Sequence, residues 1–105
     1  MKKQTAGRDL LGKLAPTFAH LNDDVLFGEV WSREKELPPR ERSLITIAAL
    51  MAQGSYPQLQ SHFEIGKNNG ISKEEAVEVV THLAFYCGWP KAWSAFAIIE
   101  EVYGK

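Results

Sequence analysis

The stretch that decides the fold is residues 40–53, which read RERSLITIAALMAQ. From Leu44 onward the residues are almost all apolar, and the run is roughly twice as long as the five or six residues of an average strand. Gly54 follows directly, where a left-handed helix stop is expected. The pattern therefore predicts a buried helix from Arg40 to Gln53, after the break at Pro38-Pro39.

Three more helices are expected downstream. The first ends at Asn68-Asn69-Gly70, and the second begins at a capping box, Ser72-Lys73-Glu74-Glu75, and runs to about Cys87. Gly88-Trp89-Pro90 breaks this helix, and its proline can open a last helix through Val102. One face of the first of these helices carries Leu59, His62, Phe63 and Gly66. No segment of the sequence has the pattern of a strand.

Upstream of the central helix, the pattern is helical but less regular. Apolar residues between Asp9 and Leu14 recur at helical spacing, and Pro16 can sit in the first turn of a second helix to about Trp31. This pattern fits either two adjoining helices or one kinked helix. Residues 32–38 are charged and lack apolar periodicity, so we expect an exposed connection. The sequence thus predicts an all-α fold, a single-domain bundle of about six helices spanning residues 1–105.

Two of the expected helices have more apolar surface than one small core can cover. Residues 43–52 and 93–102 are apolar around most of the helix circumference, so each needs cover on more than one side. A chain of 105 residues has little interior to offer, because the buried fraction falls with size. We therefore expect part of this surface to be a subunit interface in an obligate homo-oligomer.

Composition limits the classes of partner and compartment. The chain is 45% hydrophobic and 24% charged, as in an ordinary globular domain, and its formal net charge is −1. Without excess positive charge, nucleic acid is not an expected partner. The sequence shows neither a secretory signal nor a run of membrane-spanning length, so no membrane partner is expected. The single Cys87 excludes an internal disulfide and indicates a reducing compartment, so we expect a cytoplasmic protein.

The three histidines are the first candidates for proton transfer, because imidazole titrates near neutral pH. His20 lies beside Asp23 and Asp24, which favours a solvated surface position. His62 shares a helix face with apolar residues, so its ring is expected to enter a partly apolar region, either as a core histidine with a satisfied hydrogen bond or as a catalytic group. His82 stands among valine, leucine and alanine neighbours, which favours a core position.

Arg42 opens the most apolar helix of the chain, near its positively polarised end. At the edge of a buried pocket, this guanidinium would attract anions. The alternative is a surface arginine paired with Glu41 or Glu34, and the sequence leaves both interpretations open.

Other site classes have no support in the sequence. No His, Cys, Asp or Glu residues recur at the spacings of zinc or di-iron sites, so no metal is expected. No motif brings Cys87 or a serine to a base, and phosphate-binding and dinucleotide-binding fingerprints are absent.

Several segments together resemble the γ-carboxymuconolactone decarboxylase family in order and spacing, over roughly residues 25 to 103. They are Gly28-Glu29-Val30-Trp31-Ser32-Arg33, Arg42-Ser43-Leu44-Ile45-Thr46-Ile47-Ala48, Leu59 with His62, Asn69-Gly70, Glu74-Glu75, Glu78-Val79, and Tyr86-Cys87-Gly88 with Pro90 and Ala92. The resemblance implies an all-helical fold shared with the alkylhydroperoxidase D group, commonly assembled as a trimer or a hexamer.

The peroxidase branch of that superfamily carries a Cys-x-x-Cys pair shortly before a histidine equivalent to His62. Here Ser55 and Gln58 occupy the cysteine positions, and Ser43 stands near the position of a glutamate one helix earlier. Without paired thiols there is no dithiol to oxidise, so peroxidase chemistry of that type is not expected. A peroxidase that used Cys87 alone would depend on a thiol at an apolar helix end, where a thiolate is disfavoured.

The resemblance implies a cofactor-free decarboxylase of 4-carboxymuconolactone, or of a related small carboxylic acid lactone, in the breakdown of aromatic compounds. Such an enzyme needs cationic contact for carboxylates and a developing oxyanion, and a proton for carbon. On this basis Arg42 is expected to bind the anion and His62 to act as general acid. Glu29, Trp31 and Tyr86 are expected to line the substrate pocket or to orient the histidine. A peroxidase of the same superfamily and a non-catalytic small-molecule-binding oligomer remain alternatives.

Overall fold

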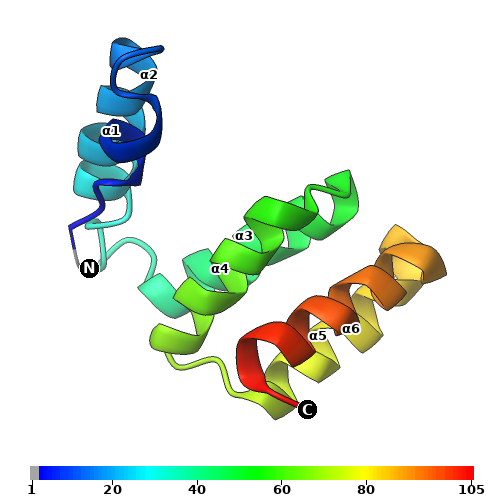
Figure 1. The fold of residues 1–105 in the computed structure, drawn as a ribbon. Helices are drawn as coiled ribbons and strands as arrows, with labels where there is room; N and C mark the ends of the chain where they lie inside the picture. Colours follow the sequence, from blue (N-terminus) through cyan, green and yellow to red (C-terminus); the bar gives the residue numbers. More distant parts are fainter. Residues whose placement is uncertain (1–2) are drawn as a thin grey trace. The chain divides into compact units, whose positions relative to one another are not determined.

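The computed structural model describes residues 3–105, and every regular element in that range is helical. Six α-helices and one π-helix are present there, which confirms the expected all-α class. The chain divides into two compact units, one up to Pro39 and one from Arg40 to Lys105 (Figure 1), and each is described by itself. Residues 32–36 are all exposed, which confirms the predicted connection. The assignment of the whole chain to one domain stays a prediction.

The first unit contains α1 (Ala6–Leu11), α2 (Pro16–His20) and the π-helix η1 (Leu21–Val30). Pro16 begins α2, as its fixed φ angle and missing N–H favour at this position. The hydrogen bonds of a π-helix join residues five apart. This pattern continues to the end of η1, where the Trp31 N–H donates to the carbonyl of Leu26 at 2.9 Å. Apolar periodicity predicted helix here but carries no signal for the π form.

Asp23 of η1 ties the start of α1 in place. Its buried carboxylate accepts hydrogen bonds from the backbone N–H groups of Gly7 at 2.9 Å and Arg8 at 3.0 Å, and from the Asn22 amide at 3.0 Å. The bond from Asn22 first, and then those from the backbone, hold the pKa of Asp23 below its ordinary value. A Cβ at Gly7 would lie 2.7 Å from Asp23 Oδ1, so only glycine allows this close approach.

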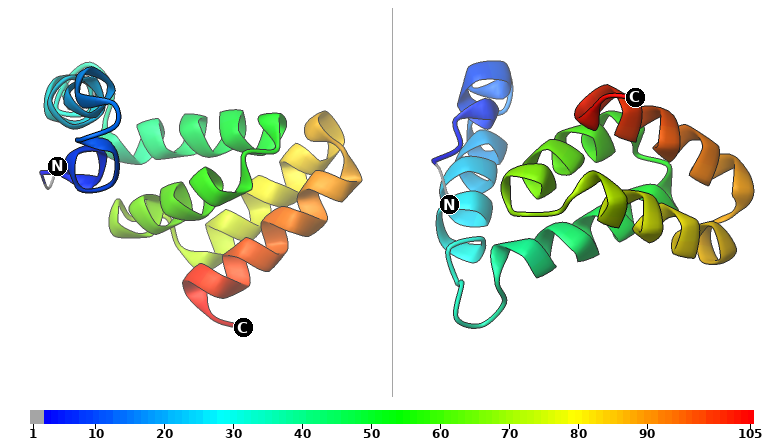
Figure 2. Two further views of the ribbon diagram at one scale, coloured as in Figure 1. Left: turned by 45° about the horizontal axis from the view of Figure 1, so that its top comes forward. Right: turned by 90° about the horizontal axis from the view of Figure 1, so that it is seen from below.

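The second unit consists of two antiparallel helical hairpins (Figure 2). The first pairs α3 (Pro39–Gln53) with α4 (Tyr56–Asn68), and the second pairs α5 (Lys73–Cys87) with α6 (Trp89–Tyr103). These bounds agree with the helices expected from the sequence to within a few residues.

The helix ends follow the signals in the sequence. Ser72 Oγ accepts from the Glu75 N–H at 3.1 Å, and Glu75 Oε1 accepts from the Ser72 N–H at 3.0 Å, so the predicted capping box is present. Gly54 has φ of 72° after α3, and Gly88 has φ of 106° between α5 and α6. These left-handed angles favour glycine, and both turns fall where the helices had been expected to stop.

Polar contacts between the hairpins show which helices are neighbours. Arg40 at the start of α3 forms an ion pair with Glu75 at the start of α5. Lys67 near the end of α4 donates to the carbonyl of Val102 near the end of α6 at 3.2 Å. Thus α3 lies beside α5, and α4 lies beside α6.

The core of the second unit lies between the hairpins. Gly66 of α4 packs against α3 and the segment that follows α4, because a Cβ there would lie 3.4 Å from Ile47 Cδ1 and 3.0 Å from Ile71 Cδ1. Burying one of the larger apolar side chains contributes about 1.5–3 kcal/mol. The buried residues of this core are Ile47, Met51, Leu59, Phe63, Ile71, Ala76, Val80, Ala84, Ala92, Ala95 and Ile99.

Large apolar side chains remain exposed where α5 meets α6. Phe85 is 77% exposed and Trp93 72%, with Trp89 between them at the turn. Phe85 and Trp89 contact each other edge to face, with ring centroids 5.7 Å apart. Within the two helices for which surplus apolar surface was expected, Ile45 and Trp93 are exposed, whereas the homo-oligomer stays a prediction. Within residues 3–105, no helix is both long enough and apolar enough to cross a membrane.

Candidate functional site

His62 lies on α4 as a half-buried side chain, and its Nδ1 atom is buried. Burial disfavours the charged imidazolium and lowers the pKa of His62 below its ordinary value. The ring is therefore predominantly neutral at neutral pH. The expectation that this ring lies away from open water is confirmed, while its role as a core histidine or a catalytic group stays a prediction.

The flank of α4 that carries His62 faces α3. Asn69, at the end of α4, donates from its side-chain amide to Ser43 Oγ on α3 at 3.1 Å. His62 precedes Asn69 by about two helical turns, so the two residues lie on the same side of α4.

Arg42 lies in the first turns of α3 and is partly exposed, and its carbonyl accepts from Thr46 Oγ1 at 2.7 Å. Along an α-helix, two residues correspond to roughly 200° of rotation, so Arg42 and Arg40 lie on nearly opposite sides of α3. Arg40 faces α5, where it meets Glu75. Arg42 and His62 are thus both placed in the α3–α4 hairpin, and their shared role stays a prediction.

The other three expected site residues lie in two different units. Glu29 is exposed on η1, and Trp31 directly after η1 is buried, with its ring stacked on Phe27 at a centroid distance of 5.8 Å. Tyr86 on α5 is 77% exposed, and its ring lies 5.0 Å from that of His82. Substrate contact by Glu29, Trp31 and Tyr86 stays a prediction.

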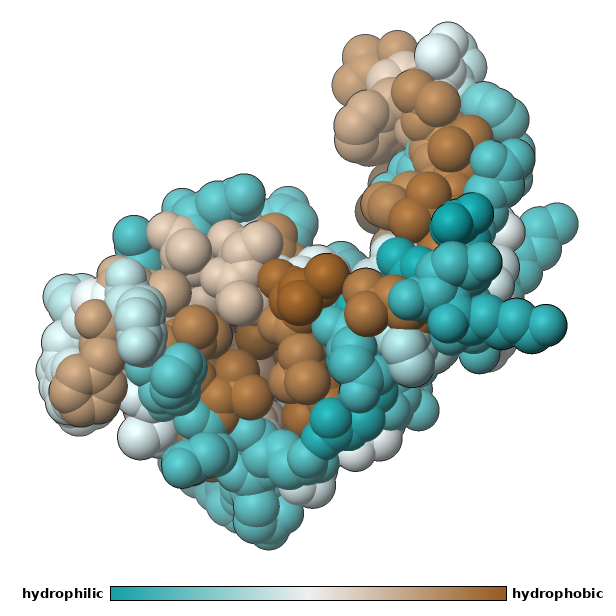
Figure 3. All heavy atoms as spheres, turned by 180° about the vertical axis from the view of Figure 1, so that it is seen from behind, coloured by the Kyte–Doolittle hydropathy of each residue, from teal (hydrophilic) through white to brown (hydrophobic). Residues whose placement is uncertain are grey.

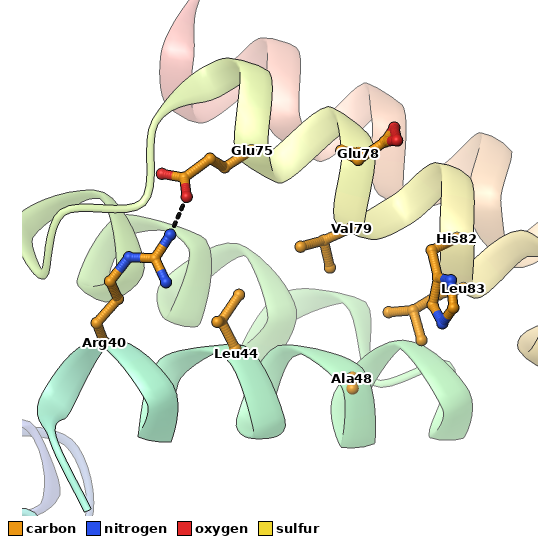
Figure 4. A pocket seen from close by; sticks show the side chains of 8 residues that line it. All are labelled: Arg40, Leu44, Ala48, Glu75, Glu78, Val79, His82 and Leu83. Carbon is orange, nitrogen blue, oxygen red and sulfur yellow. Dashed lines mark hydrogen bonds and ion pairs between the residues drawn. The ribbon is translucent and has the colours of Figure 1, made fainter.

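A cavity of about 530 Å³ opens between α3 and α5, and no pattern in the sequence predicts it. The Arg40–Glu75 ion pair lies at one end and His82 at the other (Figure 4). Apolar side chains form the surface between these ends. The lining residues are Arg40, Leu44, Ala48, Glu75, Glu78, Val79, His82 and Leu83.

The prediction that His82 is a core residue is wrong, because its side chain is exposed and borders this cavity. The buried side of α5 is formed by Ala76, Val80 and Ala84, which recur every four residues. His82 lies two residues from Val80 and so points to another side of the helix. Helical spacing, rather than the apolar neighbours along the chain, was the signal that could have placed it.

His20 is exposed, as predicted, and its Nδ1 lies 2.8 Å from Asp24 Oδ2. Cys87 is a free, partly buried thiol at the end of α5. Over residues 3–105, no three His, Cys, Asp or Glu side chains are grouped so that they could hold a metal ion. The absence of a cofactor stays a prediction.

The fold and these positions define an all-helical protein with a desolvated histidine and an arginine on one helical hairpin. The model of the carboxymuconolactone decarboxylase family matches residues 16–101, so the chain belongs to this family. The match begins earlier than the resemblance found from motifs alone.

Three curated proteins illustrate the relationship. The chain is 43% identical over 77 residues to 4-carboxymuconolactone decarboxylase of Acinetobacter baylyi, covering 73% of this chain and 57% of that protein. It is 33% identical over 75 residues to nitrosuccinic acid decarboxylase npaB of Metarhizium robertsii, covering 71% and 52%. It is 33% identical over 73 residues to peroxisomal protein 2 of Schizosaccharomyces pombe, covering 67% and 34%. The chain thus spans between a third and three fifths of the length of these relatives.

Proposed function

We propose that this protein is a cofactor-free decarboxylase whose substrate is a small anionic lactone of the 4-carboxymuconolactone type, acting in the breakdown of aromatic compounds in the cytoplasm. The observation that carries the proposal is the 43% identity to a 4-carboxymuconolactone decarboxylase. A second relative is also named as a decarboxylase, of nitrosuccinic acid. Loss of CO2 from a small acid is the chemistry that these two names share.

The environment of His62 suits the role of general acid for such a substrate. Without substrate, burial keeps the pKa low and the imidazole neutral. A carboxylate that binds nearby favours the imidazolium and raises the pKa again. The ring therefore takes up a proton as the substrate arrives and can donate it to carbon afterwards.

Arg42 supplies the positive charge that the reaction needs. When the bond to the carboxylate breaks, its electron pair moves through the C=C bond into the lactone carbonyl, and CO2 leaves. The resulting furan-like oxyanion and the remaining carboxylate are stabilised by the guanidinium, aided by the positively polarised start of α3. Transfer of the proton from His62 to carbon restores the carbonyl and returns the imidazole to its neutral form.

Three further residues are proposed to take part in the reaction. The family resemblance implies that Glu29, Trp31 and Tyr86 bind the substrate or orient the catalytic histidine. Tyr86 offers exposed aromatic surface, and Glu29 offers an exposed carboxylate that can accept a hydrogen bond, whereas Trp31 is buried against Phe27.

We also propose that the protein functions as a homo-oligomer, a trimer or a hexamer. The exposed aromatic cluster at the α5–α6 turn supports this, since contiguous apolar patches usually mark interaction sites. In the first unit, Leu10 and Leu14 are likewise exposed. Sedimentation at micromolar concentration tests the assembly, and a monodisperse monomer would refute it.

The activity is tested by following the loss of 4-carboxymuconolactone and the release of CO2 with purified wild type, His62→Gln and the control His20→Gln. We expect turnover by wild type, a fall of at least a hundredfold in His62→Gln, and little change in His20→Gln, because removal of a general acid costs roughly 10²–10⁴-fold. Full turnover in His62→Gln would refute its assignment as general acid.

Two further outcomes separate the alternatives. Saturable binding of the lactone without turnover would identify a non-catalytic binding protein. Loss of all activity in Cys87→Ala would favour the thiol-dependent peroxidase, whereas the decarboxylase proposal expects this variant to keep its turnover.

A further inference from the structure

We propose that the cavity between α3 and α5 is a second ligand site, which binds a small monocarboxylic acid with an apolar body and a distal polar group. It is separate from the proposed reaction site, because Arg40 and Arg42 lie on nearly opposite sides of α3. The inference therefore goes beyond the proposed decarboxylase activity.

The size and surface of the cavity fit such a ligand. Its volume of about 530 Å³ falls inside the range of about 300–1,000 Å³ typical of small-molecule sites. Apart from Glu78, whose carboxylate points away from α3 in Figure 4, the middle is apolar and polar groups lie toward the ends. In the view from behind, hydrophobic side chains gather in a hollow of the second unit that is rimmed by hydrophilic residues (Figure 3). The apolar lining consists of Leu44, Ala48, Val79 and Leu83.

Arg40 is the anion-binding group at one end. One terminal nitrogen of its guanidinium binds Glu75, and the other faces the Leu44 side of the cavity in Figure 4. Glu75 is itself fixed by the bond that its Oε1 accepts from the Ser72 N–H at 3.0 Å. The guanidinium is therefore held in place before a ligand arrives, with further N–H donors able to grip a carboxylate.

The charged lining residues are one arginine, Arg40, and two acidic residues, Glu75 and Glu78, so only the Arg40 end can accept a carboxylate and a second carboxylate is disfavoured. Arg40 neutralises Glu75, while the carboxylate of Glu78 points away from α3 in Figure 4. A dianion would place its second charge in a region that contains Glu78 and lacks a second arginine. This preference differs from that of the proposed reaction site, whose lactone substrate carries two carboxylates.

The length of the cavity sets the length of the ligand. His82 follows Glu75 by seven residues, which corresponds to roughly 10 Å along α5. Figure 4 shows the His82 ring on the side of α5 toward α3, where either ring nitrogen can meet a hydroxyl or a carbonyl. A hydroxyphenyl alkanoate has the required carboxylate, apolar body and distal hydroxyl.

The test is titration of the isotopically labelled protein with 3-(4-hydroxyphenyl)propionate, followed by NMR at the Arg40 guanidinium and the His82 imidazole. We expect saturable shifts at both groups. In Arg40→Gln the affinity should fall at least tenfold, and Ala48→Phe, which fills the cavity, should abolish the shifts. The matched control is Arg42→Gln, whose affinity for this probe should stay within twofold. The neutral probe 3-(4-hydroxyphenyl)propanamide should bind at least tenfold more weakly.

Three outcomes would overturn the site: equal affinity of wild type and Arg40→Gln, shifts centred on Arg42 and His62, or no saturable shift because a second copy of the chain occupies the cavity. The lactone assay on the same preparations distinguishes failure of this ligand site from failure of the proposed decarboxylase activity. Probe binding without lactone turnover refutes only the decarboxylase, and turnover without probe binding refutes only this site.

Discussion

Asn69 donates a hydrogen bond of 3.1 Å to the hydroxyl of Ser43 and so joins the end of α4 to the start of α3. Ser43 is completely buried. The bond lies beside Arg42 at one end of the hairpin, and His62 precedes its donor by about two helical turns.

Replacing Ser43 by alanine should therefore lower the free energy of unfolding. The Asn69 amide would lose its acceptor in a part-buried position, which costs about 1–3 kcal/mol. Urea denaturation measures the change, with Ser61→Ala as control because Ser61 is exposed on α4. Equal unfolding midpoints for wild type and Ser43→Ala would show that the bond contributes nothing to stability.

Gly66→Ala should also destabilise the second unit. Alanine gains up to about 1 kcal/mol in helix propensity, but its Cβ would lie 3.0 Å from Ile71 Cδ1 within a packed core, where overpacking costs about 1–3 kcal/mol. Because Ile71 is itself buried, we expect the steric cost to prevail by about 1 kcal/mol. A higher midpoint of thermal unfolding in Gly66→Ala would mean that Ile71 moves aside freely.

His62 should make stability depend on pH in a defined direction. Its pKa is lowered in the folded state, so the unfolded state binds the proton more readily. Its contribution to stability is complete above the ordinary histidine pKa and is lost as the pH falls toward the folded value. Comparing wild type with His62→Gln in urea at several pH values between 8 and 5 should show a smaller loss on acidification in the variant, and parallel curves would contradict this.

Asp23→Ala should loosen the start of α1. The N–H groups of Gly7 and Arg8 would lose their acceptor, so their hydrogen exchange should become faster. Exchange at core amides of the second unit, such as Phe63, should not change. Glu36→Gln, at an exposed position in the connection, serves as control. Unchanged protection of Gly7 in Asp23→Ala would exclude this anchoring role.

Arg42→Lys should separate charge from geometry in anion binding. Lysine keeps the positive charge but loses the planar fork that grips a carboxylate with two bonds. We expect kcat/KM on the lactone to fall roughly tenfold to a hundredfold, as loss of a charge-assisted bond of about 1.5–3 kcal/mol implies. Steady-state kinetics measure this, and wild-type values in Arg42→Lys would remove the arginine from the site.

Local sequence signals predicted the helices of the second unit and their ends. They did not predict the cavity between α3 and α5. The apolar run of α3, the capping box at Ser72 and the glycine stop at Gly54 act over a few residues, so the sequence was sufficient to place them. The pairing of Arg40 with Glu75 joins positions 35 residues apart, and only the packing of α3 beside α5 reveals it.

The error at His82 has a similar physical origin. Its chain neighbours are apolar, but a helix turns side chains by about 100° per residue, so adjacent residues face different surroundings. The position of Arg42 relative to His62 likewise depends on the angle between two helices, which no local pattern encodes. The π-helical form of η1 was missed because its hydrogen bonds leave no distinctive mark in apolar spacing.

Glu75 links the first turn of α5 to the position of Arg40 on α3. One carboxylate oxygen closes the first turn of α5 through Ser72, and the other holds Arg40 at the end of the cavity. Terminal turns of helices open at low free-energy cost compared with global unfolding. Each time this turn frays, the guanidinium of Arg40 loses its anchor as well, so the ion pair between α3 and α5 is tied to the breathing of a single helix end.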